Sequence, residues 1–279
     1  ELLDRFLNPD FYEGAEPLRV PRQMDPMTFR LFETIGEPLP SRILPRAYAV
    51  ADLRDIAGWK SQLEAAERLT RAGALPDNLL LGLYTDRQPA ASGGVWDRVA
   101  ALQRFETALR TSSPEAVAKT LPPAWEAMRE ASLEVAFATL FAEPLSTIPL
   151  AGHAAILARD VALLSPAYEA AAARVIGRSP EDELLRAVAR GDTPAGPAPD
   201  APLAAAVHDA FTNSAPRADL MALARDKELG MAVLRLLSLL HDGASGDTSA
   251  LRDALATLRA LGLEDTARRA ALQIVLLQQ

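Results

Sequence analysis

Three short segments of this chain share a pattern that predicts a tight turn between two helices. Each has an arginine at the end of an amphipathic run, then small residues and a leucine, and then the start of a second amphipathic run. A cation is favourable at the C-terminal end of a helix, and glycine or serine beyond that end reduces the strain of the backbone conformation that ends the helix. We therefore expect helix–turn–helix corners. The segments are Arg71–Asp77, Arg129–Val135 and Arg259–Asp265.

The composition also favours helices over sheet. Hydrophobic residues make up 49% of the 279 residues, whereas aromatic residues make up only 5%. Most of the apolar residues are alanine and leucine, which lose least on entering a helix. Alternating runs of β-branched and aromatic residues, which strands prefer, are not found over any useful length. We expect an all-α fold with no significant β-sheet.

The helices are expected to stack as an irregular α-hairpin solenoid, a superhelix similar in style to tetratricopeptide repeats. Short connections make successive helices antiparallel neighbours. The corner segments lie 58 and 130 residues apart, so no fixed period indicates a regular repeat family. The prediction is therefore an irregular array of hairpins.

Prolines and glycines divide the chain into four parts. Residues 1–24 carry closely spaced breakers and are expected to form an extended N-terminal arm. Residues 25–190 are expected to form a helical body, in which Pro122–Pro123 ends one helix. Residues 191–202 contain four prolines and predict an extended linker or surface crossover. Residues 203–279 are expected to form C-terminal helical hairpins.

Charge and hydropathy argue against two classes of partner. The formal net charge is −8, which opposes a phosphate backbone, and no segment gathers cations and aromatic residues on one face. We expect no nucleic-acid binding. No apolar run reaches the roughly 18 to 20 residues needed to span a bilayer, so we do not expect an integral membrane protein.

No pattern predicts a catalytic residue, a metal ligand or a cofactor-binding residue. The chain has no cysteine, which removes thiolate nucleophiles and cysteine-ligated metals. His153, His208 and His241 lie too far apart for a helical metal motif. Nothing identifies an acid–base pair for glycoside cleavage among the helical glutamates. The glutamates considered are Glu64, Glu67, Glu126 and Glu130.

One possible binding surface surrounds an irregular loop in the first half of the chain. A glycine-rich loop before a helix can offer backbone N–H groups to an anion. Tryptophans can line a groove for a ligand or peptide, although at helical spacing they are more commonly core residues. The residues of this surface are Trp59, Tyr84, Arg87, Gly93, Gly94 and Trp96.

Two stretches resemble segments of a known group of proteins. Residues 51–60, Ala-Asp-Leu-Arg-Asp-Ile-Ala-Gly-Trp-Lys, and residues 82–98, which begin Gly-Leu-Tyr-Thr-Asp, resemble uncharacterised exported helical proteins of GC-rich proteobacteria. Those proteins are similar in style to the superhelical part of soluble lytic transglycosylases, whose catalytic domain has no counterpart here. The resemblance implies a helical superhelix in the periplasm and assigns no activity. A start at Glu1 rather than Met is expected after removal of a targeting segment, or inside a longer protein.

These observations favour a noncatalytic binding or scaffold protein. Its concave helical surface would engage a protein, a peptide or a cell-wall component in the periplasm, and the expected partner is another envelope protein or a peptide. One alternative is a hydrolase or lyase of cell-wall glycans whose site assembles only in three dimensions. Another is a carrier of an apolar small ligand.

Overall fold

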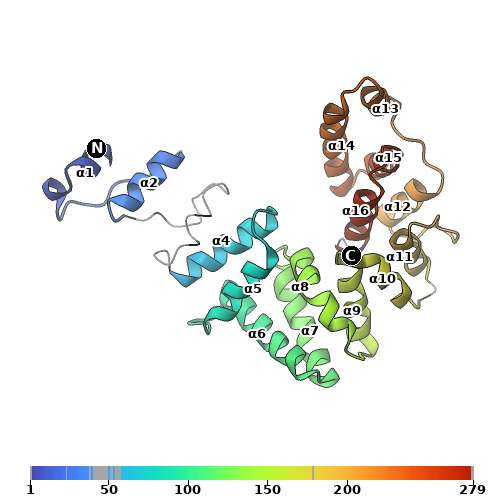
Figure 1. Cartoon of the computed structure of the whole chain (residues 1–279), viewed down its shortest axis with the longest axis horizontal. Helices are drawn as coiled ribbons and strands as arrows, with labels where there is room; N and C mark the ends of the chain where they lie inside the picture. The colour runs from blue at the N-terminus through green and yellow to red at the C-terminus, as the bar shows by residue number, and fades with distance from the viewer. Residues whose placement is uncertain are drawn as a thin grey trace. The chain divides into compact units, whose positions relative to one another are not determined.

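The structure, a computed structural model, describes residues 2–22, 24–37, 39, 50, 53, 58–177 and 179–277. All regular elements in these ranges are helices, which confirms the all-α prediction (Figure 1). The elements are α1 (Leu2–Leu7), the 3-10 helix η1 (Pro9–Tyr12), α2 (Pro26–Thr34), α4 (Trp59–Arg71), α5 (Asp77–Asp86), α6 (Val95–Thr111), α7 (Pro114–Arg129), α8 (Glu134–Ser146), α9 (Gly152–Leu164), α10 (Tyr168–Ala171), the 3-10 helix η5 (Ala172–Arg174), α11 (Pro180–Arg190), α12 (Pro202–Thr212), α13 (Ala218–Arg225), α14 (Leu229–Ala244), α15 (Thr248–Ala260) and α16 (Glu264–Leu277).

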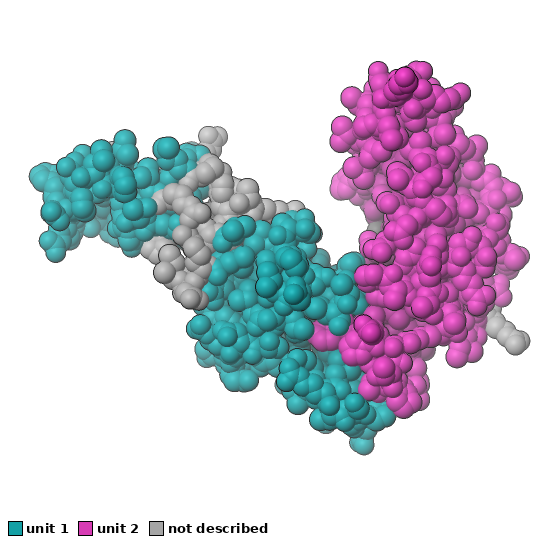
Figure 2. Space-filling view, viewed as in Figure 1, with its two compact units in different colours: residues 1–140 teal, residues 141–279 magenta. Residues whose placement is uncertain are grey.

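The chain divides into two compact units, residues 1–140 and residues 141–279 (Figure 2). The division falls within α8. Among the residues that the structure describes, no helix combines the length and the apolarity required to cross a bilayer.

In unit 1, helices α4 to α7 pack mainly against their sequence neighbours. Helix α5 contacts α4 and α6, and α6 contacts α7. Phe137 of α8 joins this stack, since its ring lies 5.3 Å from the ring of Phe105 on α6 and 5.6 Å from that of Trp125 on α7. Contact between successive helices is the pattern that stacked α-hairpins show.

The N-terminal part of unit 1 has a small core of its own. Helix α1 contacts α2, and Phe29, Phe32 and Leu39 are buried together. Part of the expected extended arm is therefore helical, in α1 and η1, whereas residues 15–21 have no regular structure.

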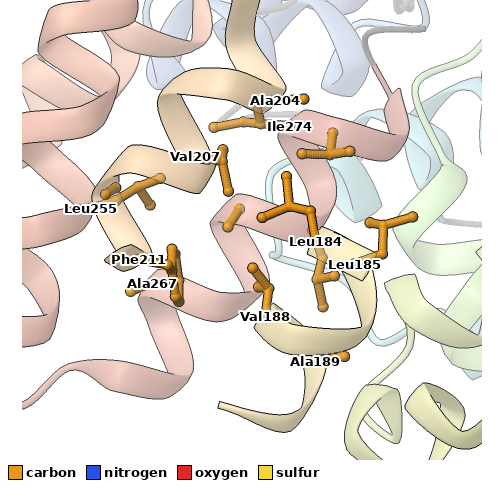
Figure 3. Close-up of a cluster of buried hydrophobic side chains, with 14 of the residues drawn as sticks. Leu184, Leu185, Val188, Ala189, Ala204, Val207, Phe211, Leu255, Ala267 and Ile274 are labelled. Carbon is orange, nitrogen blue, oxygen red and sulfur yellow. The ribbon is translucent and has the colours of Figure 1, made fainter. Parts of the chain in front are cut away.

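Unit 2 closes around one cluster of buried apolar side chains (Figure 3). Helix α16 packs against α15 and also against α9, α11 and α12, which are distant in sequence. A regular solenoid has contacts only between neighbouring repeats, so unit 2 departs from the expected superhelix. The labelled residues of the cluster are Leu184, Leu185, Val188, Ala189, Ala204, Val207, Phe211, Leu255, Ala267 and Ile274.

The predicted linker, residues 191–202, lies inside unit 2. Its backbone is irregular from Gly191 to Ala201, as expected. However, α11 before it and α12 after it contact each other and both pack on α16. The ring of His208 on α12 also contacts the carbonyl oxygen of Gly196 at 3.1 Å. Residues 191–202 therefore connect two helices that pack in one unit, and the division between the units lies within α8.

All three predicted corners join two helices, so the corner predictions are confirmed. Gly73, Ser132 and Gly262 adopt the left-handed conformation there, with φ of 66°, 54° and 80°. In each corner the next N–H donates to the carbonyl five residues earlier, at 2.8, 3.0 and 2.9 Å. This is the Schellman arrangement, which provides a partner for a carbonyl at the helix end.

The expectation that Pro122–Pro123 ends a helix is wrong. Helix α7 runs from Pro114 to Arg129 through both prolines. Leu121 and Ala124, on either side of the pair, are fully buried. Packing therefore holds the helix together, although each proline removes a backbone donor, at a cost of about 3 kcal/mol in a helix interior.

Candidate functional site

Two residues of the predicted binding surface, Trp59 and Tyr84, are buried in unit 1. Trp59 is 7% exposed and Tyr84 is 0% exposed. The Trp59 ring lies 5.2 Å from the ring of Trp96, and its Nε1 donates to the carbonyl of Leu83 at 3.0 Å. These side chains hold α4, α5 and α6 together, because a buried ring contributes mainly through packing.

Trp96 is half-buried against Trp59, and the other three residues of that predicted surface lie outside this core. Arg87 is exposed and pairs with the adjacent Asp86 at 2.9 Å. Gly93 and Gly94 are exposed and have φ of 92° and 56°, a conformation that glycine adopts without strain. Their role in the structure is to turn the chain into α6.

Behind Tyr84 lies a buried carboxylate, Glu67. Arg98 donates to its two oxygens from Nε and Nη2, both at 2.8 Å, and the Tyr84 hydroxyl donates to Oε1 at 2.6 Å. Burial, together with the neighbouring Glu67 carboxylate, raises the pKa of Tyr84 well above its ordinary value. A bidentate arginine with a third donor satisfies a carboxylate in a buried site. Glu67 therefore has a structural role.

Two of the other glutamates considered for catalysis pair with a cation on their own helix, and the third is exposed. Glu64 pairs with Lys60 at 3.6 Å, and Glu126 pairs with Arg129 at 3.0 Å. Glu130 is exposed at the end of α7. Ion pairs of this kind are common on the solvent-exposed faces of helices.

Burial raises the pKa of three other carboxyl groups, those of Asp77, Glu134 and Asp160. A raised carboxyl pKa in a pocket would be a sign of acid–base chemistry. Asp160 instead contacts the guanidinium of Arg159 at 2.6 Å. None of the three lines the groove described next.

A groove of about 740 Å³ lies between α6 and α7, beside the loop that follows α5. Ala100, Ala108 and Ala116 contribute small apolar side chains to it. Gln103 holds the loop after α5 in place beside the groove, because its Nε2 donates to the carbonyls of Tyr84 and Arg87 at 2.8 and 2.7 Å. The packing of α5, α6 and α7 thus forms the groove.

The charged side chains of the groove are both cationic. Arg104 comes from α6 and Lys119 from α7, and both residues are exposed. Neither makes an ion pair or a side-chain hydrogen bond with any residue that the structure describes. Among the residues that the structure describes, no acidic side chain lines the groove. The groove is therefore locally positive on a chain whose net charge is −8.

Three threonines add hydrogen-bonding groups. The hydroxyls of Thr107, Thr111 and Thr120 donate to carbonyls of their own helices at 2.8, 2.7 and 2.8 Å. A hydroxyl that donates in this way keeps its oxygen as an acceptor. The groove can therefore accept hydrogen bonds from a ligand as well as attract negative charge.

Reasoning from the sequence did not identify this groove. A weak signal was present, since Ala100, Arg104, Thr107 and Thr111 recur at three- and four-residue steps and so share one side of a helix. Lys119, in addition, is one of only three lysines in the chain. Neither signal indicates which second helix lies alongside.

Over the ranges that the structure covers, no three His, Asp or Glu residues gather closely enough to hold a metal ion. No family model, curated protein or solved structure matches the chain. The resemblance of residues 51–60 and 82–98 to exported helical proteins remains an expectation. Residues 51, 52 and 54–57 of the first stretch lie outside the described residues.

Proposed function

We propose that this protein is a noncatalytic binding protein that holds a segment of a partner protein in the groove between α6 and α7. The observation that carries the proposal is the pair of cations, Arg104 and Lys119, which line the groove without an acidic partner. A charged side chain that makes no internal contact contributes little to stability. Exposed cations that converge on one groove are instead suited to recognition.

The functional groups of the groove favour binding over catalysis. The described lining residues supply amide, hydroxyl, guanidinium and ammonium groups, and none of these described residues is a carboxylate, an imidazole or a tyrosine. Acid–base chemistry at neutral pH needs a group that can change protonation near that pH. This composition supports a binding site rather than the alternative of a glycan hydrolase or lyase.

The helical stack supports the same proposal. Helices α4 to α7 pack as successive neighbours, and a stack of hairpins presents a rigid surface on which side chains keep their spacing. We place the protein in the bacterial periplasm, with another envelope protein or a peptide as its partner. This setting rests on the resemblance of residues 51–60 and 82–98, and cell fractionation tests it.

Site-specific photocrosslinking tests the proposed function. A photoreactive amino acid replaces Ala100 or Thr107 in the groove, or Thr85 as a control, and the full chain is incubated with extract of the source organism. Thr85 is matched to Thr107, because it is exposed and its hydroxyl donates to the carbonyl four residues earlier, at 2.9 Å compared with 2.8 Å.

Both groove positions are expected to crosslink to the same protein, and the control position is not. Substitution of Thr107→Trp in a chain labelled at Ala100 should abolish the crosslink, since an indole would obstruct the α6 side of the groove between Ala100 and Thr111. A crosslink that forms equally well from Thr85, or that persists with Trp at position 107, contradicts binding in the groove.

A further inference from the structure

The charge of the groove indicates the charge of its occupant. Arg104 lines it from α6 and Lys119 from α7, and no acidic residue is among its lining residues in the described part of the chain. The chain as a whole carries a net charge of −8, so the rest of the molecule repels an acidic partner on balance. An acidic segment is therefore attracted to this groove in preference to the remaining surface.

The spacing of the threonines indicates the conformation of the occupant. Thr107 and Thr111 are four residues apart on α6, which separates them by about 6 Å along the helix axis. In an extended peptide, N–H groups on one side recur every second residue, at about 6.7 Å. The two hydroxyl oxygens can thus accept hydrogen bonds from successive same-side N–H groups of an extended chain.

The size of the side chains agrees with a peptide backbone in the groove. The lining of α6 extends from Ala100 to Thr111, about 16 Å of helix, which matches about five residues of extended chain. Alanines at positions 100, 108 and 116 allow a backbone to approach closely. None of the lining residues within the described ranges is aromatic, so these residues offer no stacking surface of the kind that single-stranded nucleic acid requires.

We infer that the occupant of the α6–α7 groove is an acidic peptide segment in extended conformation. Its carboxylates pair with Arg104 and Lys119, and its backbone donates to Thr107 and Thr111. This inference rests on the proposed function, because it names the chemistry of the segment that the groove holds.

Fluorescence anisotropy with three labelled octapeptides tests the inference on the full chain. The peptides alternate alanine with glutamate, glutamine or lysine, so they differ in charge but little in length or extension. We expect the glutamate peptide to bind at least about tenfold more tightly than the glutamine peptide, and to weaken as salt is added. The lysine peptide should not bind.

A charge-matched pair of variants locates the effect. The variant Arg104→Glu with Lys119→Glu should weaken binding of the glutamate peptide by at least about tenfold. The control is Arg190→Glu with Arg235→Glu, two exposed arginines of α11 and α14 whose reversal gives the same change in net charge. The affinity of this control variant for the glutamate peptide should stay within about twofold of that of the unmodified chain, since long-range charge effects are weak at physiological salt.

The outcomes separate the inference from the proposed function. Equal binding of the glutamine and glutamate peptides, blocked by Thr107→Trp but not by Thr85→Trp, overturns the acidic occupant and supports the groove as a binding site. Equal loss in the two charge-reversal variants, or no binding by any peptide, also overturns the inference. The proposed function is then decided by the crosslinking experiment, which makes no assumption about charge.

Discussion

Arg268 donates from its Nε to the main-chain carbonyl of Val188 at 2.9 Å, across 80 positions of sequence. Its Nη2 also donates to the carbonyl of Ala189, and its Nη1 pairs with Glu169 at 2.7 Å. The guanidinium lies 4.9 Å from the ring centre of Tyr168. Carbonyls in the last turn of a helix have no partner within it. Arg268 on α16 therefore completes the end of α11.

Two of the corner arginines act in a similar way on other helices. Arg71 donates to the carbonyl of Ala131 at 2.8 Å, just beyond the end of α7. Arg259 donates to the carbonyls of Ala210 and Phe211 at 3.3 and 3.2 Å, near the end of α12. Arg268 differs from both, because two nitrogens of its planar fork, Nε and Nη2, reach two carbonyls together, which an ammonium group does less well.

The first prediction concerns the contact of Arg268 with the end of α11. Arg268→Lys keeps the charge but loses the fork, so buried carbonyls at the end of α11 lose donors. The Val188 carbonyl keeps the Gly191 N–H as a donor at 3.1 Å, so we expect the free energy of unfolding to fall by about 1–3 kcal/mol in urea denaturation. The control, Arg269→Lys, changes an exposed arginine paired with Asp265 and should cost less than about 1 kcal/mol. Equal losses in the two variants would contradict a capping role.

The second prediction concerns the buried carboxylate of unit 1. Glu67→Gln leaves the guanidinium of Arg98, which is 15% exposed, without its anionic partner. Breaking a buried pair from one side costs about 3–5 kcal/mol. Glu126→Gln, in a pair that is 46% and 53% exposed, should cost less than about 1 kcal/mol. Thermal and urea unfolding followed by circular dichroism measure both, and a loss below 1 kcal/mol at Glu67 would refute the structural role assigned to it.

The third prediction concerns alkaline pH. Burial, followed by the hydrogen bond to Asp265, raises the pKa of Tyr168 from 10.0 to about 12. Above pH 10.0 the unfolded chain releases a proton that the folded chain retains. The contribution of protonated Tyr168 to the free energy of unfolding is thus complete below pH 10.0, and it disappears as pH rises through about 12.

The Tyr168→Phe variant isolates this contribution. The difference in unfolding free energy between the unmodified chain and the variant should be constant below about pH 10 and should shrink above it. Urea titrations at a series of pH values measure the difference. A difference that grows with alkaline pH would mean that Tyr168 has a lowered pKa.

The fourth prediction concerns the corner between α7 and α8. Ser132 has φ of 54°, a left-handed conformation that costs an L-residue about 1–2 kcal/mol. Ser132→Gly should therefore raise the free energy of unfolding by about 0.5–1 kcal/mol after the greater entropy of unfolded glycine is included. Ser245→Gly is the control, since Ser245 is exposed at the end of α14 with φ of −84°. A gain at Ser245 as large as at Ser132 would rule out relief of backbone strain as the cause.

Local interactions define both ends of α11. Ser179 and Pro180 indicate the start of α11 and Gly191 its end, and the structure shows the Ser179 hydroxyl accepting from the Asp182 N–H at 3.1 Å, with Gly191 at φ 77°. Such interactions join residues within one turn, so a short stretch of sequence contains both partners. Pro122–Pro123 was misread because burial of the flanking residues outweighed the local signal.

The candidate site could not be predicted in the same way. Trp59 and Tyr84 were assigned to a possible surface, and packing of α4, α5 and α6 buries them. Arg104 and Lys119 lie on different helices, and their shared groove depends on how α6 packs against α7. The properties of the individual residues do not indicate that α6 and α7 pack against each other.

Sequence patterns alone predict an all-α protein with corners at three positions, since helix propensity and capping act between residues a few positions apart. Three features depend on tertiary packing instead: the division between the units, the helix ends that Arg71, Arg259 and Arg268 complete, and the positive groove on an acidic chain. Those features depend on contacts between helices, and the free energy of such contacts comes from burial and geometry that no local pattern specifies.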